Sequence, residues 1–76
     1  MNKKNQMSYN LSTILFNSGN KEFENKNYTA SLIYYFNSKR TDYNTYHNIS
    51  ACYYKIGINF YNNKIYQKTM DILIIV

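Results

Sequence analysis

The stretch SGNKEFENKNYTASLIYYFNSK, residues 18–39, decides the fold, because it contains the end of one helix, a turn and a complete second helix. Asn27 can cap the start of the second helix, and Lys39 with Arg40 suits its end through the helix dipole. The residues expected on its packed face recur at helical spacing: Tyr28, Ser31, Leu32, Tyr35 and Ser38. The small serines predict a close contact with a neighbouring helix.

The segment before residue 18 continues this pattern toward the N-terminus. Leu11, Ile14 and Leu15 start an apolar stripe that leads to Phe23, so we expect a helix over residues 9–25 after a polar lead of residues 1–8. Gly19 lies within the stripe. Glycine inside a helix costs roughly 1 kcal/mol relative to alanine, so its place on the packed face predicts that another helix approaches closely there.

Two more helices are expected after the turn at Thr41, Asp42 and Asn44, whose side-chain oxygens can cap a helix. Apolar residues at spacings of three and four predict a third helix that ends at Gly57, a suitable residue for a left-handed cap. The predicted packed face of this helix consists of Tyr46, Ile49, Tyr53 and Ile56. A fourth helix is expected at about residues 60–73, capped by Asn59. Strands rank second, because sustained alternation is lacking.

These segments form two helical hairpins, and the first resembles one repeat of the tetratricopeptide repeat (TPR) family. Over residues 12–45 the resemblance rests on Leu15, Gly19, Tyr28, Ser31, Tyr35 and Ser38. Residues 46–76 resemble a second repeat through Asn48, Ser50, Tyr53 and Gly57. The departures are Ser18 in place of leucine, serines in place of both alanines, and Tyr43 in place of proline. The predicted fold class is therefore all-α, with antiparallel helix pairs stacked as a short TPR-like solenoid over residues 9–76.

The resemblance implies a non-catalytic scaffold that binds a peptide or protein on its concave face. TPR domains that hold acidic C-terminal tails use a Gly-Asn pair and the asparagine of the next repeat to clamp a carboxylate. The matching residues here are Asn20 and Asn48, whose amides can donate hydrogen bonds. Phe16 stands where that clamp has a lysine. Phe16 and Tyr9 are expected to add aromatic contact surface for the partner.

The net charge of +5 raises the alternative of a small basic nucleic-acid-binding protein. The charge is spread along the chain, however, and eight lysines accompany a single arginine. Asn, Tyr, Ile and Lys supply more than half of the residues, and their codons are all rich in A and T. Nucleotide bias therefore accounts for the basicity more simply than selection for a polyanion, and a nucleic-acid partner ranks below a protein partner.

Catalysis is not expected, because the chain offers one histidine, one cysteine, four carboxylates and no glycine-rich phosphate loop. His47 and Cys52 are five residues apart, so they do not share a helix face. We expect Cys52 to be a small buried group and His47 to be a surface residue. The ligand supply is too small for a metal site, and no cofactor is expected.

The length of 76 residues allows one small domain, and the single Cys52 excludes an internal disulfide. The N-terminal residues lack a signal-peptide pattern, and the sequence has no apolar run long enough to span a membrane. A cytoplasmic location without membrane contact is therefore expected. Two repeats without a polar cap leave the apolar segment 72–76 at the end. We therefore expect self-association, or a structural fragment of a longer TPR protein.

Overall fold

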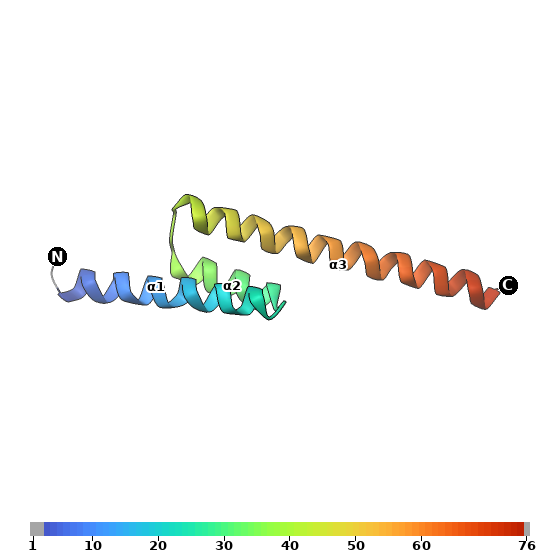
Figure 1. Ribbon diagram of the computed structural model, residues 1–76, viewed down its shortest axis with the longest axis horizontal. Coiled ribbons are helices and arrows are strands. Elements are labelled where there is room, and N and C mark those ends of the chain that lie inside the picture. Colours follow the sequence, from blue (N-terminus) through green and yellow to red (C-terminus); the bar gives the residue numbers. More distant parts are fainter. Residues whose placement is uncertain (1–2, 76) are drawn as a thin grey trace.

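The computed structural model describes residues 3–75 and contains three helices, α1 (Lys3–Glu24), α2 (Tyr28–Ser38) and α3 (Tyr43–Ile75). Figure 1 shows α1 and α2 as an antiparallel hairpin, with α3 lying along α2 and running back in the direction of α1. The described part of the chain is helical apart from its two turns, which confirms the predicted all-α class. The molecule is elongated, with principal extents of 69 × 18 × 15 Å.

The two turns of the chain use left-handed lysines rather than glycines. Lys26 between α1 and α2 has a φ of 64°, and Lys39 at the end of α2 has a φ of 56°. The backbone N–H of Lys39 donates to the carbonyl of Phe36 and closes the last turn of α2. Asn27 occupies the predicted cap position, but its side chain donates to Glu22 Oε2 instead of capping α2.

The start of α3 is capped as the sequence predicts. Asp42 Oδ1 accepts hydrogen bonds from the backbone N–H and the hydroxyl of Thr45, which satisfies one of the free donors in the first turn. Arg40 donates to the other carboxylate oxygen of Asp42 at 2.6 Å. These bonds lower the pKa of Asp42 from 3.8 to about 2, with the Arg40 contact as the main cause.

The core lies where α2 is held between α1 and the first half of α3. Leu32, Tyr35 and Cys52 are buried at its centre, and the partly buried side chains packed against them are Phe16, Phe23, Ile49 and Ile56. The predicted packed face of α2 is confirmed, with Ser31, Leu32, Tyr35 and Ser38 all buried. Gly19 is also buried, and its carbonyl accepts a 2.7 Å hydrogen bond from the Ser31 hydroxyl, as expected for a close helix approach.

Two predicted packing faces are partly wrong. Leu11 and Ile14 are exposed, although α2 reaches this level of α1, where the Ser12 hydroxyl donates to the Ser38 carbonyl at 2.9 Å. The side of α1 that faces α2 runs through Ser12, Phe16 and Gly19 instead. On α3 the packed face is turned by about one residue from the prediction, so Tyr46 and Tyr53 are 53% and 55% exposed. Thr45 and Cys52 are buried in their place. A threonine and a cysteine fit closer to α2 than two tyrosines do.

The predicted boundaries of the helices also require correction. Residues 1–8 were expected to be a polar lead, but α1 already begins at Lys3. The predicted break at Gly57 is wrong, because α3 continues through it and Gly57 has no positive φ. Ending the helix would leave carbonyl groups unpaired on one side and N–H groups unpaired on the other, whereas a helical glycine costs only about 1 kcal/mol.

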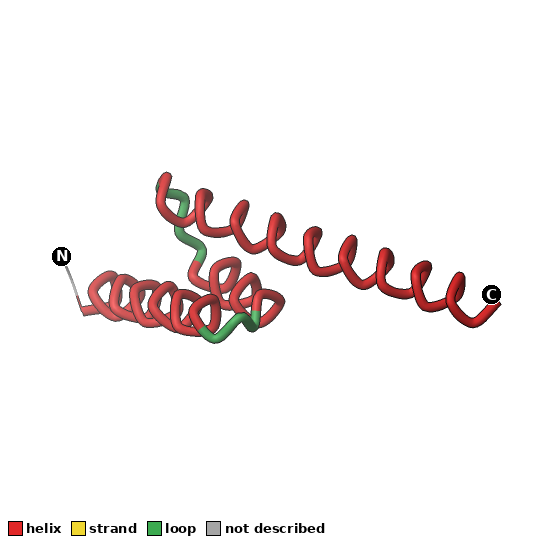
Figure 2. Tube along the Cα trace, turned by 45° about the vertical axis from the view of Figure 1, so that its right-hand side comes forward, coloured by secondary structure: helices red, strands yellow, loops and turns green. Residues whose placement is uncertain are grey.

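As a result, the second hairpin expected over residues 46–76 is absent from the described residues, where a single long helix replaces it. The C-terminal half of α3 extends past the α1–α2 turn, with no other helix beside it in either Figure 1 or Figure 2. Every residue from 59 to 71 is exposed. The side chains of the apolar segment 72–76 lie outside the part that the structure describes.

Candidate functional site

The two asparagines expected to bind a partner lie together in the structure. Asn20 Oδ1, on α1, accepts a 3.1 Å hydrogen bond from Asn48 Nδ2 on α3. The same oxygen accepts a 2.5 Å hydrogen bond from the hydroxyl of Tyr35 on α2. One amide oxygen therefore links all three helices, and it fixes both asparagine side chains.

The backbone contact at Gly19 sets this geometry. Because residue 19 has no Cβ, the Tyr35 ring lies against α1 and its hydroxyl reaches Asn20, one residue further along the helix. Ser31, one turn before Tyr35, donates a hydrogen bond to the Gly19 carbonyl. The Ser31 hydroxyl also accepts a hydrogen bond from the Cys52 thiol, with 3.4 Å between Sγ and Oγ. Burial raises the pKa of Tyr35, so the ring keeps its hydroxyl proton for Asn20.

A pocket of about 500 Å³ opens beside this hydrogen-bonded group, and we call it the asparagine pocket. Its lining comes from α1, α2 and α3: Asn20, Phe23, Glu24, Tyr35, His47, Asn48 and Ala51. The lining includes one carboxylate and no lysine or arginine. Its electrostatics therefore suit a neutral or basic ligand better than the acidic tail that the TPR resemblance implies.

The hydrogen bonds leave part of each amide unused. Asn20 uses only its oxygen, so its Nδ2 group has two N–H donors that take part in no protein hydrogen bond among the described residues. Asn48 uses one N–H, and its Oδ1 likewise accepts no such bond. The asparagine pocket thus offers a donor and an acceptor side by side.

Phe16 is held in the hairpin and offers little free surface. Its ring centroid lies 5.6 Å from that of Tyr35, and the Arg40 guanidinium carbon lies 4.2 Å above its ring. This cation–π contact also positions Arg40 beside Asp42. Phe16 therefore supports the pocket through Tyr35, and it is not among the lining residues.

Tyr9 lies apart from the asparagine pocket. It lines a smaller pocket of about 260 Å³ together with Ser12, Thr13 and residues 39–42 of the α2–α3 turn. The structure therefore brings Asn20 and Asn48 together, places Phe16 behind them, and separates Tyr9 from all three.

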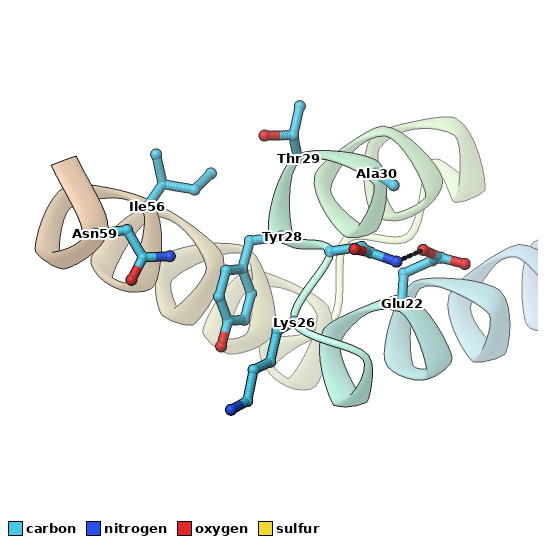
Figure 3. A pocket seen from close by; sticks show the side chains of 8 residues that line it. Glu22, Lys26, Tyr28, Thr29, Ala30, Ile56 and Asn59 are labelled. Atoms are coloured by element: carbon cyan, nitrogen blue, oxygen red, sulfur yellow. Dashed lines mark hydrogen bonds between the residues drawn. The ribbon is translucent and has the colours of Figure 1, made fainter. Parts of the chain in front are cut away.

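A further pocket, of about 520 Å³, lies at the α1–α2 turn and was not expected from the sequence. Figure 3 shows Tyr28 between the turn residue Lys26 and the α3 residue Asn59, with Ile56 nearby. Tyr28 packs edge-on against Phe23 at a centroid distance of 5.1 Å. Asn59 lines this pocket because α3 continues through Gly57, and the predicted break there would have moved it away.

The burial of Cys52 and the exposure of His47 agree with the sequence predictions. Cys52 is fully buried, and burial raises the pKa of its thiol. His47 is exposed and stacks on Tyr43 at 5.9 Å. Within the described residues no three histidine, cysteine or acidic side chains gather in a way that could hold a metal ion. None of the described helices has the length and apolar character needed to cross a membrane.

Comparison with known proteins returns no match to any family model, any curated protein or any solved structure.

Proposed function

We propose that this chain is a non-catalytic protein-interaction module that binds an extended peptide segment in the asparagine pocket. The observation that carries the proposal is the shared hydrogen bond of Asn20 and Asn48, which leaves the Asn20 N–H groups and the Asn48 carbonyl oxygen unused at the pocket. A backbone peptide group presents one carbonyl and one N–H, so it matches this pair.

Hydrogen bonds within the protein orient the asparagine pair before any ligand binds. Tyr35 and Asn48 both donate to Asn20 Oδ1, which orients the Asn20 N–H groups without help from the ligand. Prior ordering lowers the entropy cost of binding. The resemblance of the α1–α2 hairpin to a TPR unit supports the same function, since such units present first-helix residues to their partners.

The charges of the pocket indicate the chemistry of the peptide. Glu24 lines the pocket, and no lysine or arginine does. A peptide with a lysine or arginine beside the bound backbone group would pair with Glu24, whereas an acidic tail would be repelled. We therefore propose a neutral or basic peptide. The lone reduced Cys52 agrees with a cytoplasmic setting.

The experiment is selection of a random dodecapeptide library displayed on phage against the full chain, followed by fluorescence anisotropy with the selected peptides. Asn20→Asp keeps the oxygen that Tyr35 and Asn48 bind but removes the N–H donors. The uncharged peptides among those selected are the ones compared, because the carboxylate that this variant adds would attract a basic peptide. For these peptides we expect the variant to weaken binding about tenfold, or about 1.4 kcal/mol. Asn37→Ala, on an exposed part of α2 away from the pocket, is the matched control and should bind as the unchanged chain does.

Two results would count against the proposal. The first is a library that yields no peptide above background. The second is a set of peptides whose affinity is the same for Asn20→Asp as for the Asn37→Ala control. A mixed-sequence oligonucleotide serves as the comparison ligand, and salt-sensitive binding of it in place of peptides would favour the nucleic-acid alternative.

A further inference from the structure

A regular row of exposed side chains follows one flank of α3. Tyr46, Ser50, Tyr53, Gly57 and Phe60 succeed one another at spacings of four, three, four and three, and all five are exposed. We call this row the aromatic seam. Spacings of this kind repeat every seven residues and keep one flank of a helix facing a neighbouring helix along its whole length.

The seam alternates large and small residues. Phe60 is 69% exposed, and the two tyrosines are exposed by more than half. A Cβ added at Gly57 would have no atom within 4 Å, so the space over this glycine is open. Aromatic side chains separated by such gaps can interlock with a second helix as knobs in holes.

The row continues beyond Phe60 with polar residues at the same spacing, namely Lys64, Gln67 and Asp71. The continuous helix makes this second half available to another chain. Because Gly57 is helical and α3 does not turn there, residues 60–71 cannot fold back onto the seam of their own chain. Most helical stability in proteins comes from packing of a helix face, so a helix packed along residues 60–71 would stabilise this segment.

We propose that the aromatic seam binds a second copy of this chain, with two α3 helices paired antiparallel about a two-fold axis near residues 58 and 59. This register sets Gly57 of one chain opposite Phe60 of the other, so the ring fills the open space over the glycine. It also sets Tyr53 opposite Lys64, Ser50 opposite Gln67 and Tyr46 opposite Asp71, each twice by symmetry.

Each of these pairs is chemically complementary. A lysine ammonium on a tyrosine ring is a cation–π contact, and serine with glutamine, or a tyrosine hydroxyl with aspartate, forms a hydrogen bond. The same chain supplies both members of every pair, which is what a self-complementary two-fold contact demands. The residues of this flank give no similar argument for an unrelated protein as the partner.

The pairing leaves the asparagine pocket open. On a helix of 3.6 residues per turn, residues two apart lie about 200° around the axis from one another. Tyr46 and Asn48 are so related, as are Tyr53 and Ala51, and both Asn48 and Ala51 line the pocket. The seam and the pocket therefore occupy opposite flanks of α3, and the two proposals are tested independently.

The first test measures the mass of the full chain by sedimentation equilibrium over a range of concentrations. We expect a monomer–dimer equilibrium. Tyr53→Lys should raise the dissociation constant at least about tenfold. Tyr54→Lys replaces the next tyrosine, which is also exposed but faces about 100° away, and should change the constant by less than about twofold. A monomer at all concentrations, or equal effects of the two variants, would overturn the proposal.

The second test identifies which chain covers the seam. In a Ser50→Cys and Gln67→Cys double variant, oxidation should join residue 50 of each chain to residue 67 of the other and give a covalent dimer. Each single variant has a cysteine on only one side of these pairs, so it should not form this cross-link. The native Cys52 is fully buried and does not compete. A cross-link within one chain would mean that α3 folds back on itself, which contradicts the proposal even if the variant is compact and stable.

Discussion

The Tyr35 ring lies directly against Gly19, so that a Cβ added at residue 19 would come within 2.6 Å of the ring carbon Cε1. This contact joins α1 to α2 and carries the Tyr35 hydroxyl to Asn20. The fold of the hairpin and the order of the asparagine pocket therefore depend on the same missing methyl group.

Gly19→Ala should destabilise the chain. Alanine favours the helix by about 1 kcal/mol, but its Cβ would collide with the Tyr35 ring, which must then move away from its hydrogen bond to Asn20. Overpacking of this kind costs about 1–3 kcal/mol or more. We expect a net loss of up to about 2 kcal/mol in urea unfolding. Gly57→Ala, measured in dilute solution, is the control. Its Cβ meets no atom within 4 Å, so it should raise stability instead.

Acid should weaken the start of α3 through Asp42. The folded pKa of about 2 lies below the ordinary 3.8, so the stabilisation is complete above about pH 4 and disappears as the pH falls toward about 2. Thermal melts across this range should show the loss. Asp42→Asn keeps a capping oxygen but has no charge to lose, so its melting temperature should depend less on pH in the same window. Identical profiles for the two chains would contradict this assignment.

Alkaline solution should weaken the core through Cys52 and Tyr35. Burial raises the pKa of both groups, so their contribution is complete below the ordinary values of 9.0 and 10.0 and is lost as the pH rises through the folded values. The melting temperature should therefore fall above about pH 9. Cys52→Ala should shift the onset of this fall toward the tyrosine range. A thiol reagent should modify Cys52 slowly until the chain unfolds.

Amide hydrogen exchange should divide α3 into two halves in dilute solution. One face of residues 45–56 packs on α2, whereas every residue from 59 to 71 is exposed. Amides in the second half should therefore exchange at least about tenfold faster. Raising the protein concentration should protect residues 60–71 if the aromatic seam is covered by a second copy. Uniform protection in dilute solution would show that the free half is held by its own chain.

The sequence was sufficient for the α1–α2 hairpin because local signals and packing agree there. The packed face of α2, the close approach at Gly19 and the Asp42 cap all follow from residue type and spacing. The hydrogen bond between Asn20 and Asn48 was not predicted. Which amide groups of Asn20 and Asn48 are hydrogen-bonded depends on the Tyr35 hydroxyl, which donates to Asn20 Oδ1. Residue spacing in the sequence does not contain that information.

The second half was harder to predict because its signals are nearly balanced. Gly57 followed by Asn59 is a good helix stop, but its cost inside a helix is small, and the chain contains no proline to enforce a break. The seam residues Tyr46 and Tyr53 were predicted to be buried, because helical spacing identifies an apolar face of a helix. The spacing does not indicate whether that face packs within its own chain or against another chain. A pattern that fits a hairpin within one chain also fits the same contacts between two chains.

The opposite placement of seam and pocket on α3 has a consequence for affinity. A pair of chains joined through the seam carries two asparagine pockets, both facing away from the joint. A partner with two suitable peptide segments would then bind the second segment at a high effective concentration, with a gain that can reach about a hundredfold or more without any new contact. Weak recognition at a single small pocket would in that case become avid, bivalent binding whose strength depends on the spacing of the two segments.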